Sequence, residues 1–164
     1  MPRSAVYKNI MRKKPNILLT DDEDTFRNIM AKELTRMGYN VVSCASGSET
    51  INTLHERDFD VVILDMNMPV MGGIETLKRV KEMEPTTEVI VLTGQGSIES
   101  AVQAIKSGAY DYLTKPFAMD ELTARVRMLI RRKTNLPTSL IKIRDLSIDT
   151  AKREIFRDQQ EIYL

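Results

Sequence analysis

Five short apolar runs alternate with segments of helical periodicity, and this alternation restricts the possible folds more than any other feature. The runs are NILLT (16–20), NVVSCA (40–45), DVVILD (60–65), EVIVLT (88–93) and YDYLTK (110–115). Cores such as VVIL and VIVL are continuously apolar, as expected of parallel strands covered on both faces. Five βα units with short connections therefore predict an α/β fold with a doubly wound, five-stranded parallel sheet.

The segments between the runs have the spacing of amphipathic helices. In the first segment, apolar residues follow the i, i+3, i+4, i+8 pattern, namely Phe26, Ile29, Met30 and Leu34. Gly38 marks the end of this helix. Two later segments predict helices over 97–108 and 118–133.

Composition and net charge exclude several classes of function. A chain of 164 residues with 42% hydrophobic and 29% charged residues suits one domain with an appendage, or one large domain. The net charge of +1 gives no overall attraction to nucleic acid or anionic lipid. The single cysteine, Cys44, fits a reducing cytoplasm and should pack as a small hydrophobe. Since no apolar run approaches the roughly 20 residues of a membrane span, we expect a cytoplasmic protein without membrane contact.

Polar side chains follow four of the five runs. They are Asp21–Asp22, Asp65, Thr93 and Lys115, and the carboxyl ends of parallel strands share one edge of the sheet. Three carboxylates in one place need a cation, and Mg²⁺ suits carboxylates combined with a phosphate. Asp65 is the candidate nucleophile because a rigid strand aims it. Lys115 could pair with a phosphoryl group, and Thr93 could donate a hydrogen bond to it.

Each of these residues also has an ordinary explanation. An Asp at a strand–helix junction is usually a helix cap, and we expect Glu23 and Asp24 to serve the first helical turn in that way. The only histidine, His55, is expected to face solvent near a helix end. The coincidence of five polar residues at one edge favours a functional site over five separate explanations.

This set resembles the receiver (CheY-like) domain of two-component response regulators. The resemblance rests on Asp21–Asp22, on Asp65 in DMNMP, on Thr93 in LTGQG and on Lys115 in YLTKPF, and it spans residues 15–134. It implies the flavodoxin-like form of the doubly wound fold. It also implies a cis peptide bond between Lys115 and Pro116, which only X–Pro bonds adopt at modest cost.

The resemblance assigns roles to single residues. It implies Asp65 as the phosphoacceptor, and Asp22 and Asp65 as direct Mg²⁺ ligands. Asp21 would act on the ion through water and Asn67 through its backbone carbonyl. Thr93 and Tyr112 would form the switch pair, and Gly94 would leave room for the phosphoryl group.

The implied activity is signalling. A sensor histidine kinase would donate the phosphoryl group, and the 97–133 face would then change to control an output, expected to be transcription. A homodimer through that face is one arrangement the family allows. The domain would not be an enzyme on a separate substrate, since its chemistry would be limited to self-phosphorylation and autodephosphorylation.

The two ends of the chain depart from the alternation of apolar runs and helical segments. Residues 1–14 form a basic leader, 135–139 a linker, and 140–164 short alternating strands with a polar turn. The last segment resembles the opening β-meander of the winged-helix DNA-binding domain in OmpR/PhoB-type regulators. Its recognition helix would lie beyond Leu164, so we expect no specific DNA binding by this truncated chain and DNA binding by its full-length parent.

Two other classes of protein share part of this pattern. A haloacid-dehalogenase-like phosphatase also uses an Asp nucleophile and Mg²⁺ and stays the alternative, but it needs DxD on the first strand, where Asp22 and Asp24 offer only a displaced DED. A flavin carrier of the same architecture would need a phosphate-binding loop after the first strand. Four consecutive acids at that place would repel a phosphate.

Overall fold

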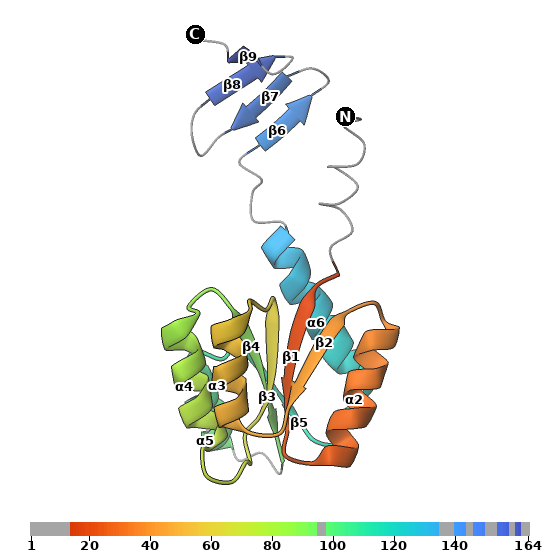
Figure 1. Ribbon diagram of the computed structural model, residues 1–164, viewed down its shortest axis with the longest axis vertical. Coiled ribbons are helices and arrows are strands. Elements are labelled where there is room, and N and C mark those ends of the chain that lie inside the picture. The colour runs from red at the N-terminus through yellow and green to blue at the C-terminus, as the bar shows by residue number, and fades with distance from the viewer. Residues whose placement is uncertain are drawn as a thin grey trace. The chain divides into compact units, whose positions relative to one another are not determined.

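The structure is a computed structural model that describes residues 14–94, 98–134, 140–143, 146–149, 154–157 and 160–161 (Figure 1). The chain divides into two compact units, Met1–Val126 and Arg127–Leu164. Residues 1–13 of the expected leader and the whole expected linker, 135–139, lie outside the described residues, so both stay predictions. Of the helices described, none combines the length and the apolar character needed to cross a bilayer.

The first unit is built on a five-stranded parallel sheet in the order β2-β1-β3-β4-β5, which confirms the predicted fold. The strands are β1 (Asn16–Thr20), β2 (Asn40–Cys44), β3 (Val61–Asp65), β4 (Glu88–Thr93) and β5 (Asp111–Thr114). Each strand end lies within one residue of the predicted run. The helices are α2 (Asp24–Arg36), α3 (Gly47–Glu56), α4 (Gly73–Met83), α5 (Ile98–Lys106) and α6 (Met119–Thr134), the last of which continues into the second unit.

The helices cover the sheet in two layers. Figure 1 shows α3, α4 and α5 on one face, and α2 with the first part of α6 on the other. The chain passes from β1 outward to β2 and then returns to β3 on the other side of β1. This reversal of strand order opens a crevice beyond the carboxyl ends of β1 and β3, where doubly wound folds bind their ligands.

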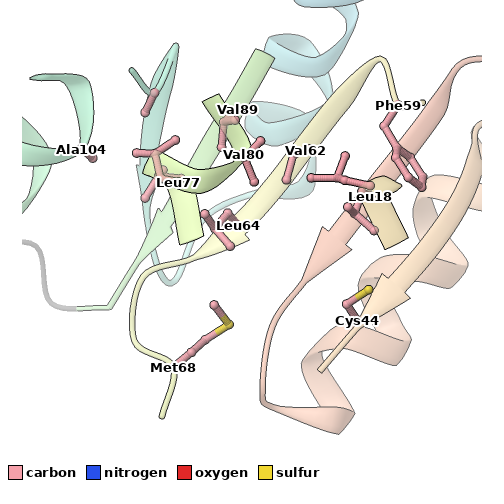
Figure 2. Packing of buried hydrophobic residues seen from close by; sticks show 13 residues of the cluster. Leu18, Cys44, Phe59, Val62, Leu64, Met68, Leu77, Val80, Val89 and Ala104 are labelled. Atoms are coloured by element: carbon pink, nitrogen blue, oxygen red, sulfur yellow. The ribbon is translucent and has the colours of Figure 1, made fainter. Parts of the chain in front are cut away.

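The central strand β3 is buried along its whole length, which explains its continuously apolar sequence. Val62 and Leu64 belong to the same buried cluster as Leu77 and Val80 of α4 (Figure 2). Because side chains alternate along a strand, Val61 and Ile63 point to the opposite layer, where both are also fully buried. Packing on both faces holds β3 firmly in the sheet.

Helix α2 departs from the predicted apolar pattern at one position. Met30 and Leu34 are buried, whereas the side chain of Ile29 is 56% exposed and Phe26 is half-buried. Residues at i, i+4 and i+8 form one narrow stripe, and Ile29 lies about 100° around the helix from Met30.

Gly73 fixes the loop that follows β3. Its backbone N–H donates to the carbonyl of Met66 at 3.2 Å, which brings the start of α4 back against the end of β3. A Cβ at this position would lie 2.5 Å from the Cα of Met66 and 2.8 Å from the carbonyl oxygen of Asp65. Only glycine permits this approach, which holds the backbone beside Asp65 in place.

The second unit contains a four-stranded antiparallel sheet in chain order. Its strands are β6 (Leu140–Ile143), β7 (Leu146–Asp149), β8 (Glu154–Arg157) and β9 (Gln160–Glu161). The expected β-rich C-terminal segment is therefore confirmed. Its assignment to an output domain, and the boundary placed after residue 134, stay predictions.

The loop after β3 contains a strained residue, and its relief should be measurable. Val70, a β-branched residue, has a φ of 66° and so lies in the left-handed region. Its side chain is fully exposed, so no packing offsets this strain. We expect Val70→Gly to raise the free energy of unfolding by up to about 1 kcal/mol, after the greater chain entropy of glycine is subtracted. Urea denaturation measures the change. Thr86→Gly, at an exposed β-branched turn residue without positive φ, should instead destabilise the protein.

Candidate functional site

The carboxyl ends of β1 and β3 bring three acids together. Asp65 ends β3, and Asp21 and Asp22 directly follow β1, its parallel neighbour. Carboxylate oxygens of the three residues lie within 4.8 Å of one another. Asp21 and Asp65 are buried, while Asp22 is exposed at the mouth of the site. The structure thus brings the predicted acids into one cluster, and their individual roles stay predictions.

Lys115 is the cation of this cluster. It follows β5, and its Nζ lies 2.5 Å from Oδ2 of Asp21 and 3.6 Å from Oδ1 of Asp65. Its backbone N–H donates to the carbonyl of Thr93 at 2.7 Å, which anchors the residue to β4. The Lys115–Pro116 peptide bond is cis, as the resemblance implied. One lysine offsets only part of the charge of three carboxylates.

Asp21 contacts the residue directly before α2, Glu23. Glu23 occupies the N-cap position, as expected, but its side chain makes no cap hydrogen bond. Instead, Oδ1 of Asp21 accepts the backbone N–H of Glu23 at 2.9 Å. Arg27 donates to the backbone carbonyl of Asp21 at 2.7 Å and also pairs with Asp24, which lies in the first turn as expected. Asp21 is therefore held at both carboxylate oxygens and at its backbone carbonyl and amide.

The environment of Asp65 raises its pKa from 3.8 to about 6. Burial is the largest cause, because it penalises the charged form, and the neighbouring charge of Asp21 adds to it. Lys115 and a hydrogen bond from the backbone N–H of Asn67 oppose the rise. A buried carboxylate among other acids is costly to ionise, so a cation bound beside Asp65 would stabilise its charged form.

Thr93 and Tyr112 lie on the neighbouring strands β4 and β5. The hydroxyl of Thr93 is buried and donates to the carbonyl of Leu113 at 3.4 Å, so it bonds toward β5. Tyr112 is 40% exposed. A Cβ on Gly94 would lie 2.9 Å from Nδ2 of Asn67, so glycine allows the side chain of Asn67 to approach the end of β4. The exchange of positions expected of the switch pair stays a prediction.

Residue patterns alone missed two neighbours of the acid cluster. The ring centroid of Phe26 lies 4.0 Å from Nζ of Lys115, and Arg27 holds the backbone of Asp21. Phe26 was interpreted as one member of the apolar pattern of its helix, and Arg27 gave no signal. His55, as expected, is exposed in the last turn of α3, and Cys44 is buried in the core (Figure 2).

Fold and site together define a signalling receiver: a doubly wound five-stranded sheet with an acid cluster and one lysine at its carboxyl edge. Residues 17–127 match the family described as the response regulator receiver domain. The chain belongs to this family of two-component signalling proteins.

Similar proteins are named as transcriptional regulatory proteins. The chain is 37% identical to the transcriptional regulatory protein TrcR of Mycobacterium tuberculosis, over 99% of this chain and 67% of that protein. It is 34% identical to the transcriptional regulatory protein YkoG of Bacillus subtilis, over 92% and 68% of the two chains. Across these and similar relatives it spans 58% to 68% of their length.

Solved structures of response regulators superpose on this chain. The receiver domain of the Francisella response regulator 1452 superposes with a TM-score of 0.70 at 32% identity, over 73% of this chain and 99% of that one. DrrB of Thermotoga maritima, an OmpR/PhoB homologue, superposes with a TM-score of 0.67 at 32% identity, over 93% and 67%. The haloacid-dehalogenase-like alternative has no support, since Asp65 lies on the third strand of a receiver fold.

The raised pKa of Asp65 predicts how stability depends on pH without metal. The folded protein binds this proton more tightly than the unfolded chain, so stability should fall as pH rises from about 4 to above 6. A shift of about two units corresponds to roughly 3 kcal/mol. Asp65→Asn removes the titration, so its stability relative to wild type should increase by that order between pH 4 and 8. Denaturation in EDTA measures it, and a flat difference would contradict the assignment.

A control variant separates this titration from general charge effects. Asp58 is exposed and lies in the loop after α3. Asp58→Asn therefore serves as the matched control, since it makes the same change of side chain outside the acid cluster.

Proposed function

We propose that this receiver domain accepts a phosphoryl group on Asp65 from a sensor histidine kinase. The observation that carries the proposal is the position of Lys115, whose Nζ lies 2.5 Å from Asp21 and 3.6 Å from Asp65. A cation in this place can pair with a phosphoryl oxygen as soon as one is attached to Asp65. The firmly packed strand β3 supplies the positioning on which phosphoryl transfer depends.

The acid cluster would hold Mg²⁺. Three carboxylates with oxygens within 4.8 Å of one another are a suitable donor set for a hard divalent ion, because Lys115 offsets only part of their charge. Asp22 and Asp65 would bind it directly, Asp21 through water and Asn67 through its backbone carbonyl. The ion would supply charge neutralisation for the incoming phosphoryl group.

The transfer itself needs few groups from this chain. A carboxylate oxygen of Asp65 forms a bond to phosphorus while the bond from phosphorus to the donor nitrogen breaks, and the electron pair of that bond returns to the donor imidazole. Lys115 pairs with the transferred oxygens. The product is an acyl phosphate on the chain itself, so the protein acts as a phosphoacceptor and not as an enzyme on a separate substrate.

The output would pass through α5, β5 and the start of α6. The hydroxyl of Thr93, now bonded to Leu113, would turn to the phosphoryl group, and Tyr112 would move inward from its exposed position. Exposed apolar side chains already lie on α5, namely Ile98, Val102 and Ile105. Such a face suits a protein partner, including a second copy of this chain.

Transcriptional control is the proposed output. It is supported by relatives named as transcriptional regulatory proteins, of which this chain spans about two thirds. A longer parent protein would bind DNA, and 140–164 would be the start of that output domain. This signalling would take place in the cytoplasm, where a kinase domain and DNA would both be accessible to the protein.

Phosphorylation at Asp65 is directly testable. With acetyl phosphate and Mg²⁺, intact-protein mass spectrometry should show one added phosphoryl mass, which EDTA prevents. Asp65→Asn should abolish the addition, because the amide is not a nucleophile of this kind. The control Asp58→Asn should be modified like wild type. An Asp65→Asn protein that gained the same mass with unchanged yield would show that the acceptor lies elsewhere.

Thr93 should affect the response and not the chemistry. In Thr93→Ala, Asp65 should still be modified, while amide chemical shifts of residues 98–126 should respond less to beryllofluoride, since the hydroxyl that senses the phosphoryl group is gone. The control is Thr35→Ala, which removes an exposed hydroxyl bonded within α2. Equal shift changes in Thr93→Ala and wild type would remove Thr93 from the switch.

A further inference from the structure

Two aromatic rings from distant parts of the chain meet beside the lysine of the site. Phe26 lies in the first turn of α2, and Phe117 follows Lys115 by two residues. Their ring centroids are 6.1 Å apart, and the ring planes are nearly perpendicular, at 89°. Both side chains are half-buried. This edge-to-face contact restrains the orientation of the Phe26 ring.

The ammonium group of Lys115 lies against Phe26. Its Nζ is 4.0 Å from the ring centroid, well within the range of about 6 Å in which a cation is attracted to an aromatic face. The lysine side chain is only 21% exposed, so water screens this attraction less than at an open surface. Asp21, Asp65 and Phe26 therefore approach the same ammonium group.

We propose that Phe26 is a positioning residue for Lys115, holding the ammonium group by a cation–π contact while Phe117 restrains the ring. A lysine is a point charge on a flexible stem, and its position must be restrained if it is to meet an incoming phosphoryl group. A leucine or methionine at position 26 could fill similar volume but would lack the negative face of the ring. The effect on phosphorylation rests on the proposed role of Asp65, whereas the contact itself does not.

The chemistry of the site explains why a ring suits this position. When Asp65 carries a phosphoryl group, Lys115 must shift from Asp21 toward the new oxygens. A hydrogen-bonding neighbour would hold the ammonium in one direction, and another carboxylate would compete with the phosphoryl group. The ring does neither, because it attracts the cation over its whole face and offers no lone pair. Phe26 can keep its contact while Lys115 exchanges one anionic partner for another.

The first experiment detects the contact without phosphorylation. In ¹H–¹³C spectra, the Cε protons of Lys115, identified by their loss in Lys115→Arg, should lie upfield of other lysines because of the ring current of Phe26. Phe26→Tyr should keep this shift and Phe26→Leu should remove it. Phe117→Leu should reduce it, because the ring loses its edge-to-face partner. If Phe26→Leu does not fold, Phe26→Met serves in its place. An unchanged Lys115 signal in the leucine or methionine variant would overturn the contact.

The second experiment measures the consequence. With acetyl phosphate at saturating Mg²⁺, Phe26→Leu should be phosphorylated three- to tenfold more slowly, equivalent to about 0.7–1.4 kcal/mol, and Phe26→Tyr within twofold of wild type. Met30→Leu, a similar apolar change one turn along α2, is the control and should react like wild type. A small donor avoids any contact between α2 and a kinase. A Phe26→Tyr as slow as Phe26→Leu, or a Phe26→Leu as fast as wild type, would overturn the positioning role.

The two experiments separate this inference from the proposed function. If wild type gains no phosphoryl group on Asp65, the proposed function fails, and with it any effect of Phe26 on that reaction. The spectrum of Lys115 would still report whether Phe26 holds the ammonium group. Normal phosphorylation of wild type with no difference among the Phe26 variants would instead reject the positioning role alone.

Discussion

The crowding of three carboxylates at one edge of the sheet is the constraint on which the rest of the site depends. Asp65 is buried, so it is poorly solvated when charged, and the neighbouring charge of Asp21 makes it harder to ionise. Lys115 relieves part of this cost through its 2.5 Å contact with Asp21. The residual negative charge is what makes the cluster suitable for a divalent cation, and the same charge would repel a phosphate that arrived without one.

The scaffold makes this crowding tolerable by holding the acids firmly. β3 is buried on both faces, and Gly73 lets the start of α4 approach the backbone at Asp65 more closely than any side chain would allow. Asp21 is held by Lys115, by the amide of Glu23 and by Arg27. The acids therefore cannot move apart to reduce their repulsion. A bound cation, or a new bond at one of the carboxylates, would reduce it instead.

Hydrogen bonds connect the carboxyl end of β4, beside the acids, to β5. Thr93 is connected to β5 through its hydroxyl bond to Leu113 and through the amide of Lys115, which donates to its carbonyl. β5 is an edge strand, and it carries the exposed Tyr112. A change in bonding at Thr93 would thus act first on the strand that has a neighbour on one side only. Buried strands in the middle of the sheet would be far costlier to move.

The sequence by itself determined the five strands, their parallel arrangement and the acids and lysine at their ends. These follow from local signals, namely continuous apolar runs and the polar residue after each run. Only the tertiary structure decided that Ile29 is exposed, that Asp21 accepts the backbone N–H of Glu23, and that the ring of Phe26 faces Lys115. The reason is distance along the chain: Lys115 and Asp21 are 94 residues apart, and no periodicity within a helix or strand encodes which side chains meet across the sheet.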